Sequence, residues 1–215
     1  MVDIGGFALT FVFVVNFLEK YMKRILTISF LALSLTSCGI QSIPQAKNSV
    51  EAAFAEVNNQ YKRRMDLIPN LVSTVKGYAA HEQETLESVT QARAQATSVT
   101  IDPSKMSAEE LAKFQSAQGS LSQALGRLMV VAEKYPDLKA DQNFRDLQVQ
   151  LEGTENRITI ARQRHIEQIK NFNDLVTVPP TSWTNGLIYH FEKLPQWALE
   201  ESEQKKAQEA PKVEF

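Results

Sequence analysis

The residue whose type and position point most directly to chemistry is Cys38, the single cysteine of the chain. It ends the tetrapeptide Leu35-Thr36-Ser37-Cys38, which resembles the bacterial lipobox, Leu-small-small-Cys. In proteins with that motif the cysteine is diacylated and becomes the mature N-terminus. Several acyl chains hold a protein stably at a membrane, whereas one chain holds it only marginally. We therefore expect Cys38 to be the lipid-attachment site.

The segment before this cysteine is organised like a signal peptide. Lys23 and Arg24 precede the apolar run 25–35, which is shorter than the ~20 residues that a spanning helix needs. Positive residues in front of such a run hold that end in the cytoplasm, so the rest of the chain is translocated. We expect a location in the cell envelope, anchored to a membrane on its extracytoplasmic side. An ordinary cleaved signal and an uncleaved N-terminal anchor are the alternatives.

An earlier apolar run, residues 7–18, is separated from the second by Glu19, Lys20, Lys23 and Arg24. These charges prevent the two runs from forming one spanning helix. Because Met22 directly precedes Lys23, we interpret residues 1–21 as an extension upstream of the true start.

The histidines lack the partners that metal or catalytic sites need. His81-Glu82 begins like His-Glu-x-x-His, but Thr85 stands at the position of the second ligand. Helical di-iron sites use Glu-x-x-His, whereas Arg162 precedes His165 by three residues. No Gly-rich phosphate loop or nucleophile elbow is present. We expect no catalytic residue, no metal and no cofactor, and interpret His165 as a core or edge histidine bonded to a neighbour.

The charge balance argues against nucleic-acid binding. The chain has 23 basic and 25 acidic residues and a net charge of −2, and no basic stripe that would neutralise phosphates is visible.

The helices that must position these residues are visible as apolar side chains three and four residues apart. Such spacing predicts a first helix over 49–97, about 70 Å long, with Asn48 and Glu51 resembling a capping box. Pro69 interrupts this helix, and we expect a kink there because the apolar stripe continues in phase. The alternative is a new helix capped by Asp66.

Two further helices are predicted from caps and apolar spacing. Ser107 and Glu110 form a capping box for the second, which ends before Pro136. Asp141 caps the third, whose apolar residues follow a heptad from Phe144 onward. We therefore predict an all-α fold, an antiparallel bundle of long helices with coiled-coil-like packing and a first helix kinked at a proline.

Polar residues flank the apolar stripes of the first and third helices. They could form one network that fixes helix register, which we favour because a few polar groups in a seam specify alignment, or they could mark a partner surface. This candidate network consists of Arg64, Asp66, Asn70, Glu152, Asn156 and Arg157.

The C-terminal part differs in composition. Trp183, Tyr189 and Trp197 are candidates for membrane or partner contact, since Trp and Tyr favour half-wet positions; packing onto the end of the bundle is the alternative. The charged tail ends with Val213 and Phe215 on one side of an extended strand, so a PDZ domain could bind it. The alternative is that Phe215 docks onto the bundle or has no role. The predicted segments are 1–37 (extension and cleaved signal peptide), 38–47 (lipidated N-terminus and linker), 48–178 (bundle), 179–199 (aromatic segment) and 200–215 (mobile tail).

Three blocks resemble the LemA family: YKRRMDLIPNLVSTVKGYAAHE at 61–82, YPDLKADQNF at 135–144 and LEGTENRITIARQRH at 151–165. The similarity runs from about Ser49 to Phe215. It implies a membrane-attached bacterial protein with a long antiparallel helical bundle and no established enzymatic activity. Its genes often neighbour those of membrane metalloproteases and of another small envelope-protein family, which implies a shared complex. Many members keep an uncleaved N-terminal membrane helix, from which the Cys38 motif departs.

These observations predict a membrane-anchored scaffold or adaptor rather than an enzyme. Its partners would be the membrane, through the lipid anchor, and another envelope protein such as a membrane protease or a PDZ-containing protein, with no nucleic acid. The alternative is a ligand-binding module or an enzyme with a pocket between helices.

Overall fold

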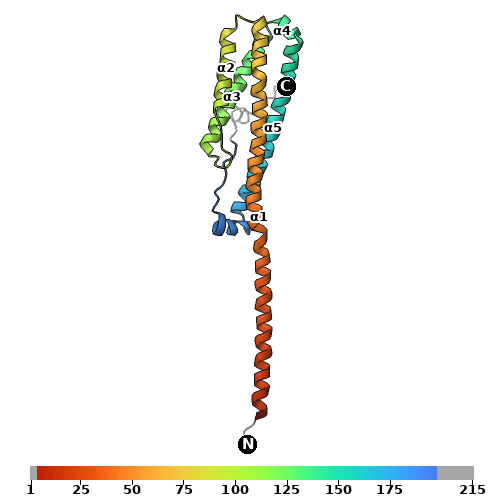
Figure 1. The fold of residues 1–215 in the computed structure, drawn as a ribbon, viewed down its shortest axis with the longest axis vertical. Coiled ribbons are helices and arrows are strands. Elements are labelled where there is room, and N and C mark those ends of the chain that lie inside the picture. Colours follow the sequence, from red (N-terminus) through yellow and green to blue (C-terminus); the bar gives the residue numbers. More distant parts are fainter. Residues whose placement is uncertain (1–3, 198–215) are drawn as a thin grey trace, which may run out of the picture. The chain divides into compact units, whose positions relative to one another are not determined.

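A computed structural model describes the backbone of residues 4–197 and the side chains of residues 19–27 and 40–197. All regular structure in this part of the chain is helical, which confirms the predicted all-α class. The described residues fall into two compact units, 4–45 with 175–192 and 46–174 with 193–197. The elements are α1 (Ile4–Tyr78), α2 (Gln83–Ser98), α3 (Ala108–Ala132), α4 (Pro136–Ala140), α5 (Gln142–Thr177), α6 (Thr181–Thr184) and the π-helix η1 (Asn185–Tyr189) (Figure 1).

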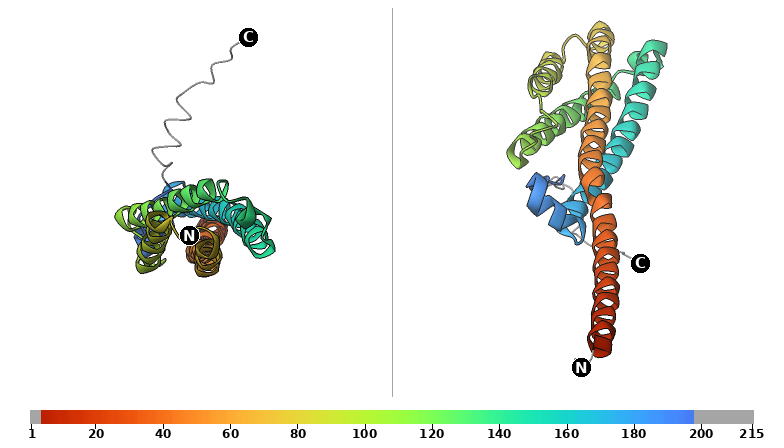
Figure 2. Two further views of the ribbon diagram at one scale, coloured as in Figure 1. Left: turned by 90° about the horizontal axis from the view of Figure 1, so that it is seen from above. Right: turned by 60° about the horizontal axis from the view of Figure 1, so that its bottom comes forward.

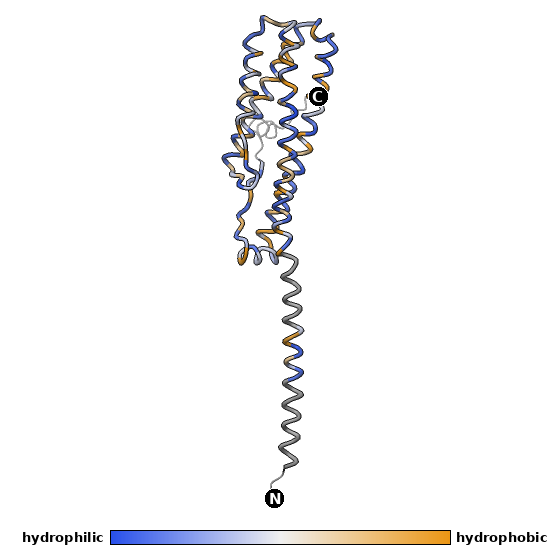
Figure 3. Tube along the Cα trace, viewed as in Figure 1, coloured by the Kyte–Doolittle hydropathy of each residue, from blue (hydrophilic) through white to orange (hydrophobic). Residues whose placement is uncertain are grey.

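The larger unit is an antiparallel bundle, as predicted. Its long helices, α1 from residue 46 onward, α2, α3 and α5, run side by side and alternate in direction (Figures 1 and 2). Apolar and polar residues alternate along each of them (Figure 3), so each helix buries one stripe and exposes the other. Burial of these stripes is the main source of stability, since isolated helices of such sequences are marginal in water.

The prediction of one helix over 49–97 is wrong. Helix α1 ends at Tyr78, and α2 begins at Gln83 and runs back along α1. Gly77 weakens the helix just before the break, because glycine loses more conformational freedom in a helix than other residues. Asn48 is not a helix cap either, because α1 is already helical there.

Pro69 lies inside α1, which continues through it without a break. Asp66 therefore does not begin a new helix. The kink at Pro69 stays a prediction.

The other predicted helix starts are confirmed. The Ser107 hydroxyl accepts from the backbone N–H of Glu110 at 3.1 Å, and the Glu110 carboxylate accepts from the backbone N–H of Ser107 at 3.1 Å. At the start of α5, the Asp141 carboxylate accepts from the backbone N–H of Phe144 at 2.9 Å. The other carboxylate oxygen of Asp141 accepts from the Tyr78 hydroxyl at 3.0 Å. The same aspartate thus caps α5 and ties its start to the end of α1.

The core of the bundle consists of two apolar clusters. The larger lies toward the α1–α2 turn and includes Leu71, Val89, Leu128 and Leu151. The smaller is rich in aromatic rings and includes Phe54, Tyr61, Phe114 and Ile158. All of these residues are buried, and the heptad predicted on α5 contributes to both clusters.

The smaller unit pairs the first part of α1 with the end of α5, α6 and η1. Val178 follows α5, and the Pro179–Pro180 peptide bond is cis. Asn185 is buried, and its amide donates to the Phe191 carbonyl at 2.9 Å while its carbonyl oxygen accepts from the Phe191 N–H at 3.0 Å. The Tyr189 hydroxyl donates to the backbone carbonyl of Ile40 at 2.6 Å. These bonds fold the turn back on itself and join it to α1.

The apolar runs 7–18 and 25–35 lie mostly outside the side chains that the structure describes. Among the residues that are described, none of the helices has a stretch long and apolar enough to cross a membrane.

Candidate functional site

A layer of polar side chains separates the two apolar clusters of the bundle. Arg64 on α1 is buried, and its guanidinium donates to the Ser122 hydroxyl on α3 at 2.8 Å and pairs with the Glu155 carboxylate on α5 at 2.9 Å. Gln118 and Thr154 are also buried at this level. One side chain therefore links three helices at a single height of the bundle, which fixes their register because a shifted helix would bury the charge against apolar groups.

Only Arg64 of the six residues in the predicted network occupies this layer. Asp66, Asn70, Glu152, Asn156 and Arg157 are exposed, and none of the hydrogen bonds found among the described side chains joins them to Arg64. Glu152 instead accepts from Gln148 on its own helix at 3.0 Å.

The actual partners of Arg64 were missed by the sequence analysis. Glu155 is half exposed, so its type and position do not distinguish it from other glutamates on the solvated face of α5. Thr154, which precedes it, lies on the predicted heptad and was the available signal. Ser122 and Gln118 stand between apolar positions of α3 and carry no charge that would have drawn attention to them.

His165 lies against the smaller core cluster, the one rich in aromatic rings. It is a core histidine bonded to a neighbour, as predicted from the sequence. It is fully buried, and its Nδ1 accepts from the indole Nε1–H of Trp197 at 2.7 Å. Its ring also contacts Phe54, with ring centres 5.3 Å apart. Trp197 in turn lies against Phe114, and the Arg162 guanidinium stands 4.9 Å from the centre of the indole ring.

These contacts define the protonation state of His165. Nδ1 accepts a hydrogen bond, so the proton of the neutral ring is on Nε2, which is buried and has no hydrogen-bond partner among the described residues. Burial lowers the pKa of His165 from 6.5 to about 4, because the imidazolium would lose its hydration. The ring is therefore neutral at neutral pH, and its Nδ1 holds Trp197, the last of the described residues, on the bundle.

The structure separates the aromatic residues that were predicted to contact a membrane or a partner. Trp197 is half-buried and packs on the bundle. Tyr189 is half-buried, bonds to α1 and stacks on Phe191 with ring centres 5.5 Å apart. Trp183 is 65% exposed. The side chain of Cys38 and residues Val213 and Phe215 lie outside the described part of the molecule.

The outer face of α5 exposes large apolar side chains. Val149 is 67% exposed and Ile160 is 49% exposed. They are 11 residues apart, with Asn156 seven residues after Val149, so all three lie on one side of the helix. Gly153 lies between them, and a Cβ atom placed there would have no neighbour within 4 Å. Glu152 and Arg157 flank this stripe, which we call the α5 stripe (Val149, Gly153, Asn156 and Ile160).

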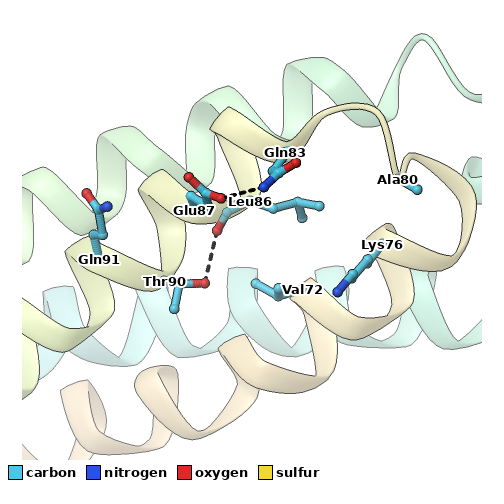
Figure 4. A pocket seen from close by; sticks show the side chains of 8 residues that line it. All are labelled: Val72, Lys76, Ala80, Gln83, Leu86, Glu87, Thr90 and Gln91. Carbon is cyan, nitrogen blue, oxygen red and sulfur yellow. Dashed lines mark hydrogen bonds between the residues drawn. The ribbon is translucent and has the colours of Figure 1, made fainter.

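Among the described residues, two hollows between helices of the bundle stand out. The larger, a groove of about 530 Å³ between the end of α1 and α2, has Val72 and Leu86 beside Lys76 and Glu87, and Gln83 donates to Glu87 across one helical turn at 2.8 Å (Figure 4). The smaller, of about 250 Å³, is lined by residues of α1, α2 and α3, including Gln118. No group of three or more metal-ligating side chains was found in the described regions.

The fold and the site define a class of protein: an up-and-down helical bundle in which one buried arginine joins three of the long helices, α1, α3 and α5. The chain belongs to the LemA family, whose family model matches residues 53–215. It is also 26% identical over 139 residues to "Protein LemA" of Metamycoplasma hominis, an alignment that covers 65% of this chain. The chain spans only 58% of the length of that relative.

Proposed function

We propose that the protein is a membrane-anchored scaffold or adaptor of the bacterial cell envelope. In this proposal Cys38 carries the lipid after cleavage of the signal peptide, and the helical bundle contacts another envelope protein through the α5 stripe. Membership of the LemA family supports an envelope-associated role, and the lipobox-like motif supports the mode of attachment.

The observation that carries the adaptor role is the exposure of Val149, Asn156 and Ile160 in the α5 stripe. A soluble helix normally turns its apolar residues toward the core, yet Val149 and Ile160 face solvent at a spacing of three helical turns. Gly153 between them would allow the backbone of a partner helix to approach closely, and the charges of Glu152 and Arg157 would orient it. The partner we propose is therefore a helix with its own apolar stripe.

Photo-crosslinking in cells tests this role. A photoreactive residue in place of Asn156 should form an adduct with one other envelope protein, and the same residue in place of the exposed Gln91 on α2 serves as the control. Changing Val149 and Ile160 to Ser should abolish the adduct without unfolding the bundle. Equal adducts at both positions, or an adduct that survives the serine changes, would refute the assignment of this surface.

The anchor has its own test. Replacing Cys38 with Ser should remove a labelled fatty acid from the protein, and should leave the chain either soluble in the exported compartment or uncleaved in the membrane. Unchanged labelling and fractionation would contradict the proposal that Cys38 is the attachment site.

A second candidate function, a ligand-binding module, is favoured by Gln118. Its side chain is buried, neither polar atom has a hydrogen-bond partner among the described residues, and it lines the smaller hollow. A buried amide without partners is costly, so a small polar molecule could supply them. Native mass spectrometry of the purified protein would then detect a bound small molecule that Gln118→Leu removes. No bound mass in either protein would leave only a packing role for Gln118.

A further inference from the structure

The turn after α5 is a stretch of chain without formal charges. Between Asp174 and Glu192 there is no Asp, Glu, Lys or Arg, although such residues make up 22% of the whole chain. The segment contains α6 and η1, so it is folded rather than a loose linker. A charged side chain is the most costly group to take out of water, and this segment has none.

The same turn exposes large apolar side chains. Leu187 is 81% exposed, Trp183 is 65% exposed, and Ile188 and Val178 are each more than half exposed. Trp183 and Leu187 are four residues apart, and Ile188 follows directly. Soluble proteins rarely leave such a group of neighbouring apolar side chains in water, and where they do, it marks a contact with a membrane or a partner. We call these four residues the turn patch.

Hydrogen bonds hold the turn patch beside a particular position of α1. The hydroxyl of Tyr189, which follows Ile188, donates to the Ile40 carbonyl at 2.6 Å. The buried Asn185 holds the rest of η1 in place through its bonds with Phe191. Figure 1 shows these short helices next to α1. Ile40 is two residues after Cys38, a rise of about 3 Å along the helix.

We infer that the turn patch enters the lipid bilayer interface beside the anchor, with Trp183, Leu187 and Ile188 as the inserted side chains. This inference rests on the proposed function, because it requires the chain near residue 38 to be at the membrane surface. A lipid on Cys38 and a retained N-terminal anchor both place Ile40 at that surface, and Tyr189 then brings the turn patch to the same level. Tryptophan at the interface is favoured because its ring is amphipathic.

The occupant of this surface is the membrane itself rather than a charged ligand. Without Lys or Arg in the turn, the contact depends on apolar burial and not on attraction to anionic lipids, in contrast to the basic helices that lie on membranes. Insertion should therefore occur on vesicles of uncharged phosphatidylcholine and should not change with salt concentration. Insertion of the turn patch would give the protein a second contact with the membrane besides the anchor. This second contact would limit rotation of the turn about the anchor.

The two tryptophans of the chain provide a matched pair of reporters. The full-length protein is reconstituted into phosphatidylcholine vesicles, with or without bromine on the acyl chains. Trp197→Phe leaves Trp183 as the single reporter, and Trp183→Phe leaves the half-buried Trp197. We expect bromine to quench Trp183 more strongly than the half-buried Trp197, and vesicles to shift Trp183 emission to the blue. Leu187→Ser with Ile188→Ser should remove both effects, whereas Val149→Ser on α5 should not.

Flotation of the same vesicles separates the two proposals. Protein that floats while Trp183 is quenched no more than Trp197 refutes insertion of the turn patch and leaves the anchor intact. Protein that fails to float refutes the anchor, and insertion with it. A blue shift that depends on protein concentration, without bromine quenching, would mean that a second copy covers the patch, which also overturns the inference.

Discussion

The buried His165 predicts how the stability of the bundle depends on pH. In the unfolded chain this imidazole has a pKa near 6.5, whereas burial lowers it to about 4 in the folded protein. Between these values the unfolded chain binds a proton that the folded chain does not, so lowering the pH favours unfolding. The contribution is fully present above pH 6.5, is lost as the pH falls from 6.5 to about 4, and changes no further below that.

The size of the effect follows from the two pKa values. One pKa unit corresponds to about 1.4 kcal/mol, so the full loss is roughly 3 kcal/mol, of which about 2.5 kcal/mol is lost by about pH 4.5. Carboxylates that are stabilised in the folded protein lose their contribution to stability at lower pH than His165 does. The backbone N–H of Phe144 and the Tyr78 hydroxyl lower the pKa of Asp141 from 3.8, so its stabilisation is lost only as the pH falls below that value.

The assay is urea unfolding of residues 39–215, followed by circular dichroism at about pH 7 and about pH 4.5, for the natural protein and for His165→Gln. The glutamine does not titrate, and its side-chain oxygen can accept the bond from Trp197. The natural protein should lose about 2.5 kcal/mol more than the variant between the two pH values. An equal loss in both proteins would refute the assignment of the pH dependence to His165.

Four further changes test the packing. Ser107→Ala should cost about 1 kcal/mol of unfolding free energy by removing the cap of α3, and a change below a few tenths would contradict its role. Leu151→Ala should cost roughly 2–5 kcal/mol in thermal or urea unfolding, since Leu151 is buried; a cost near zero would mean that its contacts are unimportant. Gly153→Ala should stabilise the isolated bundle by ~0.5–1 kcal/mol, because the new Cβ meets no neighbour, yet weaken the crosslink at Asn156. Arg64→Met should change stability by less than about 1–2 kcal/mol, because Glu155 regains water, but should broaden amide NMR signals as other registers become accessible.

Much of the fold was predictable because its signals are local. The capping box at Ser107, the Asp141 cap and the heptad of α5 each depend on residues within a few positions of one another. The turn at 79–82 was missed because the apolar spacing of α1 continues in phase into α2. Gly77 alone was too weak a signal, and the bond from Tyr78 to Asp141 that supports the turn joins residues 63 positions apart.

The site was less predictable for the same physical reason. Arg64 was selected because it flanks an apolar stripe, but the choice of Glu155 over Glu152 depends on how α1 and α5 are rotated, which no local pattern contains. Trp183 and Trp197 were grouped by type, although one faces water and the other bonds to His165. The exposure of Trp183 follows from the turn at Asn185, whose polar side chain gives no hint of burial.

The position of Trp197 has a consequence for the way the molecule is made. An up-and-down bundle has mostly short-range contacts, so its helices can pair quickly, each with the one before it. The ring of Trp197, by contrast, is supplied only after all the helices of the bundle, and it contacts Phe114 and His165, which lie 83 and 32 residues earlier. Until Trp197 is present, the Nδ1 of His165 lacks its hydrogen-bond donor and one side of the smaller core cluster is uncovered. A nascent or truncated chain that stops before Trp197 would therefore leave the rings of Phe114 and His165 accessible to chaperones and proteases, and a chain that includes Trp197 would cover them.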